Sequence, residues 1–128
     1  MQFSNWPTFA SAATAAAALA TLDVIARDNL VDRSARLGRT WVKRLSDLAT
    51  AHPIIREVRG IGLYFGVELS NPQLADAIMY ESLTRGLSFK VGGGTVLTLC
   101  PPLTVSEHEL EQAVNILDSS LRAVSRRG

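Results

Sequence analysis

The chain has 128 residues, enough for one hydrophobic core and too few for two ordinary domains. Thirteen basic residues nearly balance twelve acidic ones, so no net charge attracts nucleic acid or an anionic membrane, and we expect neither partner. The single cysteine, Cys100, excludes an intrachain disulfide and suits a reducing compartment, so we expect a cytoplasmic protein.

An alanine-rich segment, residues 9–26, predicts the first long helix. It contains eight alanines between Ala10 and Ala20, and alanine has the highest helix propensity. No Lys or Arg precedes Arg27, and alanine is only weakly apolar, which argues against a signal peptide or a membrane anchor. We therefore expect a helix that is buried within the protein.

A second helix is predicted after the Asp28–Asn29 pair, whose side chains favour a helix stop and a helix start. Its apolar residues recur at steps of four, four and three: Leu37, Trp41, Leu45 and Leu48. Because Pro53 disfavours helical geometry in the residue before it, this helix should end near His52.

Short apolar runs with glycines predict two strands between residues 54 and 69. Leu63, Phe65 and Val67 alternate with more polar or smaller residues, which is typical of a strand with one buried face. We place the turn between the two runs at Arg59–Gly60, so that the runs form a β-hairpin.

The remaining elements are a helix, two short strands and a last helix. The first helix begins after Asn71–Pro72 and ends at Gly86. The segments LSFK and TVLTLC then form strands around the three glycines at 92–94. Thr104 and Glu107 fit a capping box at the start of the last helix. Its apolar stripe is predicted to comprise Leu110, Val114, Leu117, Leu121 and Val124.

This order, α-α-β-β-α-β-β-α, predicts the α+β class. We expect a small, mostly antiparallel sheet with helices packed on one face, preceded by the long alanine-rich helix. We divide the chain into an N-terminal segment with the connecting helix, residues 1–28, and a small C-terminal domain, residues 29–128.

The residues by themselves suggest little chemistry. Three glycines at 92–94 lack the spacing of a phosphate-binding loop, which favours a hairpin turn. A Schiff-base lysine needs a desolvated or cationic setting, and we interpret Lys43 and Lys90 as solvated charges instead. We interpret Cys100 as a buried, inert thiol. No metal cluster or catalytic set can be assembled, so we predict no catalytic and no metal-binding residue in this chain.

Four segments in order resemble a known family. They are AAAALATLDVIARDNLVDRSARLG, HPIIREVRGIGLYFGVEL, RGL and VLTLCPPLTVSEHELEQAVNILDSSL. Together, from about Thr8 to Leu121, they resemble the C-terminal part of class III aminotransferases, which depend on pyridoxal phosphate (PLP). The resemblance implies a small domain whose missing large domain carries the catalytic lysine and most of the PLP site. It also implies a homodimer that moves an amino group from an amine or amino acid to a 2-oxo acid or aldehyde, which this chain cannot do alone.

Two site residues are implied by the same resemblance. Thr8 corresponds to a threonine that reaches the PLP phosphate of the neighbouring subunit, although it also suits a helix cap. Thr98 stands where many family members have an arginine that pairs with the substrate carboxylate. Threonine supplies no charge there. Three explanations follow: the substrate is held elsewhere, it is an amine without that carboxylate, or the site has decayed. A β-branched residue that suits a strand explains Thr98 equally well.

A second class of function stays open at this point. The chain could be a non-catalytic module, either truncated or pairing with another protein through its alanine and leucine surface. The sequence upstream of Met1 would distinguish the two, because the enzyme requires a lysine-bearing large domain there.

Overall fold

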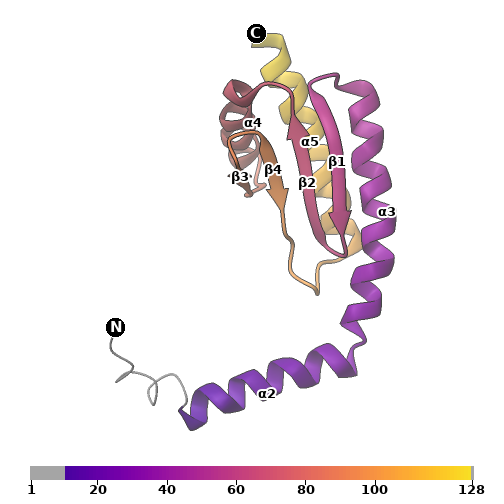
Figure 1. Cartoon of the computed structure of the whole chain (residues 1–128), viewed down its shortest axis with the longest axis vertical. Coiled ribbons are helices and arrows are strands. Elements are labelled where there is room, and N and C mark those ends of the chain that lie inside the picture. The colour runs from indigo at the N-terminus through magenta and orange to yellow at the C-terminus, as the bar shows by residue number, and fades with distance from the viewer. Residues whose placement is uncertain (1–10, 128) are drawn as a thin grey trace. The chain divides into compact units, whose positions relative to one another are not determined.

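The computed structural model describes residues 11–127, and its elements follow the predicted order (Figure 1). They are α2 (Ala12–Arg27), α3 (Leu30–Ala51), β1 (Ile55–Ile61), β2 (Tyr64–Leu69), α4 (Pro72–Thr84), β3 (Lys90–Gly92), β4 (Val96–Leu99) and α5 (Glu107–Arg127). The α+β class is confirmed. By its internal contacts the chain divides into two compact units after Arg33, and the boundary that we place at residue 28 stays a prediction.

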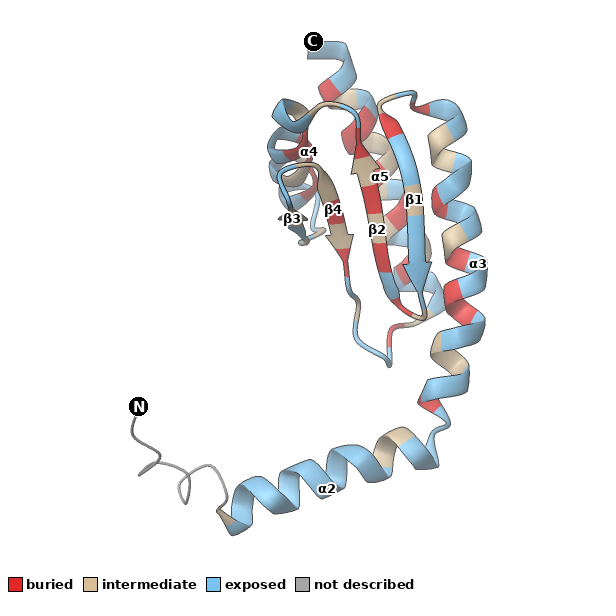
Figure 2. Ribbon diagram, viewed as in Figure 1, coloured by how far each residue is buried: buried red, intermediate tan, exposed pale blue. Residues whose placement is uncertain are grey.

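Helix α2 forms as predicted, but most of its residues are exposed, and only Val24 and Ile25 are partly buried (Figure 2). Ser11 caps its N-terminus, with the hydroxyl accepting a hydrogen bond from the Thr14 amide at 3.2 Å. No residue of α2 is buried, and Leu19 and Leu22 are 67% and 62% exposed. The prediction of a buried helix is therefore wrong for this chain. Alanine propensity is enough to form the helix.

The second unit contains a four-stranded sheet of order β1-β2-β4-β3, in which each neighbouring pair is antiparallel. Helix α5 lies behind the strands in Figure 1, with α3 beside β1 and α4 beside β4 and β3. Side chains that alternate along the central strands meet these helices, as predicted for Phe65 and Val67. The core includes Leu37, Trp41, Leu45, Phe65, Val67, Leu69, Ile78, Leu97, Leu99, Leu117 and Leu121.

The β1–β2 hairpin is confirmed, but its turn lies three residues later than predicted. Strand β1 continues through Arg59 and Gly60, which pair with Gly66 and Phe65. The chain reverses at Gly62 and Leu63. Gly62 has a φ of 54°, which glycine adopts without the steric cost that other residues meet. The left-handed glycine therefore sets the position of the turn.

The turn packs directly on α3. The Leu63 amide donates a hydrogen bond to the Ser34 hydroxyl at 3.2 Å. A Cβ on Gly38 would lie 2.2 Å from the Gly62 carbonyl oxygen, so only glycine permits this approach of helix and turn. This contact fixes the end of the hairpin against the helix.

Helix α4 begins and ends as predicted. Asn71 caps it by accepting a hydrogen bond from the Gln73 amide at 2.9 Å, and Gly86 follows its C-terminus with a φ of 97°. The Leu87 amide bonds to the Ser82 carbonyl, so residues 87–89 close the helix instead of beginning a strand. Strand β3 consequently spans Lys90–Gly92 and not the predicted LSFK.

The apolar stripe of α5 is confirmed, whereas its predicted cap is wrong. Thr104 lies in a turn, closed by a hydrogen bond from the Val105 amide to the Pro102 carbonyl. The capping box is formed by Ser106 and Glu109. The Ser106 hydroxyl accepts from the Glu109 amide at 3.0 Å and donates to its carboxylate at 2.9 Å. The observed box lies two residues further along the chain than the predicted one.

Candidate functional site

The face of the sheet opposite the helices carries the polar side chains of the strands. Cross-strand register places four residues in one row across it: Arg59 on β1, Gly66 on β2, Thr98 on β4 and Lys90 on β3. Side chains of directly paired residues point to the same face. Thr98 is therefore flanked across the sheet by a glycine and a lysine, with an arginine one strand further away.

Arg59 is held on this face by two carboxylates. Its Nη1 donates to Glu57 Oε2 at 3.2 Å and to Glu68 Oε2 at 3.1 Å. The side chain is 48% exposed, so these ion pairs contribute little stability. Their effect is to fix the direction of the guanidinium.

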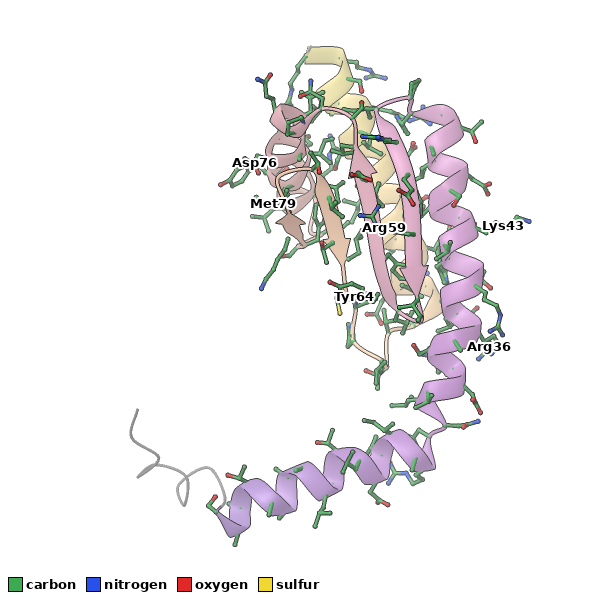
Figure 3. All side chains as sticks on the ribbon, viewed as in Figure 1. Arg36, Lys43, Arg59, Tyr64, Asp76 and Met79 are labelled. Carbon is green, nitrogen blue, oxygen red and sulfur yellow. The ribbon has the colours of Figure 1, made fainter. Side chains whose placement is uncertain are left out.

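A hollow of about 400 Å³ opens beside this row. It is lined by Arg59, Gly60, Ile61, Tyr64, Phe65, Gly66, Val96 and Thr98. Figure 3 labels Arg59 and Tyr64 on the open side of the strands. The lining contains one cation and two hydroxyl groups among apolar residues, and it contains no carboxylate. Its composition suits a small ligand with an anionic end.

Sequence reasoning identified Thr98 in this hollow and missed Arg59 and Tyr64. Thr98 is half-buried, and its Oγ1 lies on the side of Gly92, only 3.3 Å from where a Cβ on that glycine would stand. The substrate role of Thr98 stays a prediction. The hairpin pattern EVRGIGLYF contained the missing signal, since a turn at Gly62 keeps Arg59 within the strand.

The other predicted site residues are not brought together. Thr8 lies outside the described residues, so its role at the cofactor phosphate stays a prediction. Lys43 and Lys90 are both exposed, on α3 and β3. Cys100 is also exposed, so the prediction of a buried thiol is wrong. Strand β4 ends at Leu99, and the alternation that buries Leu97 and Leu99 directs the next residue outward.

These positions do not fit the covalent chemistry of PLP. A lysine that forms a Schiff base is typically desolvated, and Lys43 and Lys90 are both exposed to solvent. Among residues 11–127, no three His, Cys, Asp or Glu side chains are placed to hold a metal ion. No helix in that range is both long and apolar enough to cross a membrane.

A second hollow, of about 390 Å³, lies on the helix side of the sheet beneath the loop after β4. Its lining is mainly apolar and includes Trp41, Phe65, Leu87, Leu99, Pro101 and Leu110. Only a few polar side chains reach it, among them Glu109 and Gln112. It continues the hydrophobic core and offers less chemistry than the hollow on the open face.

A polar cluster joins His52, just after the end of α3, to the C-terminal half of α5. His52 is buried, and its Nε2 lies 2.6 Å from Asp118 Oδ1, while Arg122 Nε donates to Asp118 Oδ2 at 3.0 Å. Burial raises the pKa of Asp118, but the hydrogen bonds from His52 and Arg122 and the Arg122 charge outweigh it and hold that pKa below its usual value. The cluster lies away from the open face, so we interpret it as a structural link.

Comparison with known proteins agrees with this fold. The family model described as Aminotransferase class-III matches residues 4–121. The chain belongs to the class III aminotransferases. This family generally uses PLP, as in the ornithine and diaminobutyrate aminotransferases that the chain resembles. The resemblance stated from the sequence is therefore confirmed.

The curated relatives that this chain matches are much longer than the chain itself. The chain is 37% identical over 119 residues to the (R)-1-hydroxy-2-aminoethylphosphonate ammonia-lyase of Vibrio splendidus, covering 87% of this chain and 25% of that protein. It is 34% identical to the diaminobutyrate–2-oxoglutarate aminotransferase of Rhizobium meliloti, and the match covers 88% of this chain and 27% of that protein. The chain thus spans about a quarter of the length of the relatives that it matches.

A solved transaminase structure has the same fold over most of this chain. The structure titled "Transaminase with L-ala" matches with a TM-score of 0.82 and 30% identity, covering 89% of this chain and 29% of that one. The chain therefore has the architecture of one part of a transaminase subunit.

Proposed function

We propose that this chain is the C-terminal small domain of a PLP-dependent class III aminotransferase. In the complete protein, an amino group would pass from an amine or amino acid to a 2-oxo acid or aldehyde. The observation that carries this proposal is the family match over residues 4–121 in a chain that spans about a quarter of its relatives. The remaining three quarters would form the large domain.

The exposed lysines support a division of labour between the two domains. Neither Lys43 nor Lys90 lies in a desolvated setting, so the lysine that binds PLP would belong to the large domain. The cofactor supplies the electron sink for the reaction, and this chain would supply one wall of the substrate site. We also propose that the complete enzyme is a cytoplasmic homodimer, with Thr8 near the cofactor phosphate.

The exposed helix α2 supports the need for a covering partner. Its leucines at 19 and 22 are largely exposed among residues that are mostly alanine, although apolar surface of this kind is normally covered. The large domain would provide that cover in the enzyme. A non-catalytic pairing module is the second candidate, and the same exposed helix favours it, because a second protein would cover the same surface.

A domain exchange tests the enzyme proposal. The chain would replace the matching C-terminal part of the Rhizobium meliloti diaminobutyrate–2-oxoglutarate aminotransferase. We expect the hybrid to bind PLP and to transfer an amino group from at least one donor in a panel of amines and amino acids. The relative truncated before the exchanged part is the matched control. A folded, PLP-loaded hybrid that is inactive with every donor would contradict the proposal and favour the pairing module.

A chemical test addresses the absence of a catalytic lysine. The 128-residue chain would be mixed with PLP, reduced with borohydride and weighed by mass spectrometry. Because both lysines are exposed, we expect only scattered, substoichiometric labelling. A one-to-one adduct on Lys43 or Lys90 would show that the chain carries its own Schiff-base lysine.

A further inference from the structure

In the hollow on the open face, the Arg59 side chain lies next to Gly66, which has no side chain to fill the space there. Gly66 pairs with both Arg59 and Thr98, so it stands between them in the row. A Cβ on Gly66 would lie 3.7 Å from Arg59 Cγ and 3.8 Å from Arg59 Nε. The arginine side chain therefore runs alongside the bare backbone of Gly66, with its Nε edge at the hollow.

Arg59 has hydrogen-bond donors to spare on that edge. A guanidinium carries five N–H donors in a fixed plane. The hydrogen bonds to Glu57 and Glu68 both come from Nη1. Within residues 11–127, Nε and Nη2 donate to no side chain or carbonyl, and together they form a fork that suits a carboxylate or phosphonate. The two glutamates hold the guanidinium while this second edge stays available.

Thr98 leaves room for a ligand in the hollow and does not donate a hydrogen bond to it. Its hydroxyl lies on the side of Gly92, away from Gly66, and its side chain is much shorter than an arginine. Tyr64, which is 55% exposed and lines the same hollow, carries a phenol that can donate a hydrogen bond to an anion. The aliphatic side chains of Ile61 and Val96 complete the lining.

We propose that the hollow formed by Arg59, Tyr64 and Thr98 binds the acidic group of the amine substrate, with Arg59 supplying the charge. The identity of this group as part of a substrate rests on the proposed aminotransferase function. The hollow itself depends only on the arrangement of these strands. Arg59 on β1 thus takes the role that the family resemblance assigns to an arginine at position 98.

Charge balance predicts how strong this binding is in the isolated chain. Arg59 and Lys90 supply two positive charges on this face, and Glu57 and Glu68 supply two negative ones. The net field is therefore close to zero, and affinity comes from the fork and the phenol. Binding should be weak, in the millimolar range, and should require Arg59.

Nuclear magnetic resonance of the full 128-residue chain tests the proposal. Amide and arginine Nε–H signals would be followed during titration with acetate or methylphosphonate, against acetamide as the neutral match of acetate, at constant ionic strength. We expect saturable shifts of the Arg59 Nε–H and of the Gly66 and Thr98 amides with at least one anion, and none with acetamide. The two anions distinguish a carboxylate from a phosphonate ligand.

Three variants make the result specific. Arg59→Gln should weaken the anion affinity at least tenfold, and Arg59→Lys, which keeps the charge without the fork, should weaken it less. Arg126→Gln is the matched control and should change nothing, since Arg126 lies at the far end of α5. The same spectra report whether each variant is folded, so loss of the fold is recognised directly.

Two outcomes would overturn the proposal. One is the absence of saturable shifts around Arg59 in the folded chain, and the other is an affinity unchanged by Arg59→Gln. Either result, combined with an active domain-exchange hybrid, would reject this hollow and leave the aminotransferase function standing. Binding at Arg59 combined with an inactive hybrid would reject the function and leave the hollow as an anion site.

Discussion

On the helix-covered face of the sheet, Phe65, Val67 and Leu97 are at most 2% exposed, whereas on the open face Arg59 and Tyr64 are about half exposed. The covered residues come from β2 and β4 and the exposed ones from β1 and β2, and along β2 the two kinds alternate residue by residue. The alternation of apolar and polar residues along the strands therefore has two roles in this domain. Its apolar half binds the strands to α3, α4 and α5, and its polar half forms the candidate site.

This separation has a physical consequence for mutation. A side chain on the covered face touches several neighbours, so shortening it leaves a cavity. A side chain on the open face borders solvent, so changing it alters ligand contacts with little effect on stability. Mutations on the two faces should therefore separate loss of stability from loss of binding.

The largest expected effect on stability comes from a substitution on the covered face of the sheet. Leu97 is completely buried in β4, so Leu97→Ala should lower the free energy of unfolding by about 2–5 kcal/mol. Urea denaturation followed by circular dichroism measures this. Since the whole domain is stabilised by only about 5–15 kcal/mol, Leu97→Val provides a milder variant if the alanine variant unfolds. A loss below about 1 kcal/mol for Leu97→Ala would contradict the described core.

The second effect concerns the contact that holds the hairpin turn on α3. Gly38→Ala would gain about 1 kcal/mol of helix propensity, but its Cβ would meet the Gly62 backbone at 2.2 Å. Backbone atoms cannot move aside as a side chain can, so we expect a net loss of about 1–3 kcal/mol. Thermal and urea unfolding measure it. The control is Thr40→Ala on the exposed side of the same helix, and a stabilised Gly38→Ala would argue against the close approach.

Much of the covered face was predictable because it depends on local periodicity. The stripe of α5, the alternation in β2 and the glycine after α4 all follow from spacing within one element. The exposure of α2 was not predictable in this way. A run of alanines forms a helix equally well when it is covered and when it is not.

The open face was harder to predict, because it depends on register between strands that are distant in sequence. A turn at Arg59–Gly60 removes Arg59 from the strand, whereas the observed turn at Gly62 returns it to the row with Gly66 and Thr98. The sequence offers three glycines in this hairpin, Gly60, Gly62 and Gly66, and does not indicate which has a positive φ. The capping box posed the same problem, since Thr104 and Ser106 each precede a glutamate by three residues.

A smaller effect is expected at the polar link behind the sheet. The depressed pKa of Asp118 means that its charge stabilises the fold above the unfolded pKa, near 4, and that this contribution is lost as the pH falls through the lower folded pKa. Asp118→Asn should therefore cost about 1–2 kcal/mol at pH 7 and progressively less below pH 4. Urea unfolding across this pH range measures it. Asp76→Asn, on exposed α4 surface, is the control, and equal behaviour of the two variants would contradict the link.

The smallest expected effect on stability comes from substitutions of Thr98, on the open face of the sheet. Thr98→Val keeps the size and the branched shape of the side chain and removes only a hydroxyl that lies on the side of Gly92. Stability should change by less than about 0.5 kcal/mol, and the acetate affinity should stay within twofold.

Thr98→Arg should also fold, because the side chain extends from the open face, and the second guanidinium should raise the acetate affinity several-fold. Titration and urea unfolding of the same samples measure both quantities. If Thr98→Val abolished anion binding, the hydroxyl and not Arg59 would be the main contact; if Thr98→Arg cost as much stability as Leu97→Ala, the two faces would not be separable.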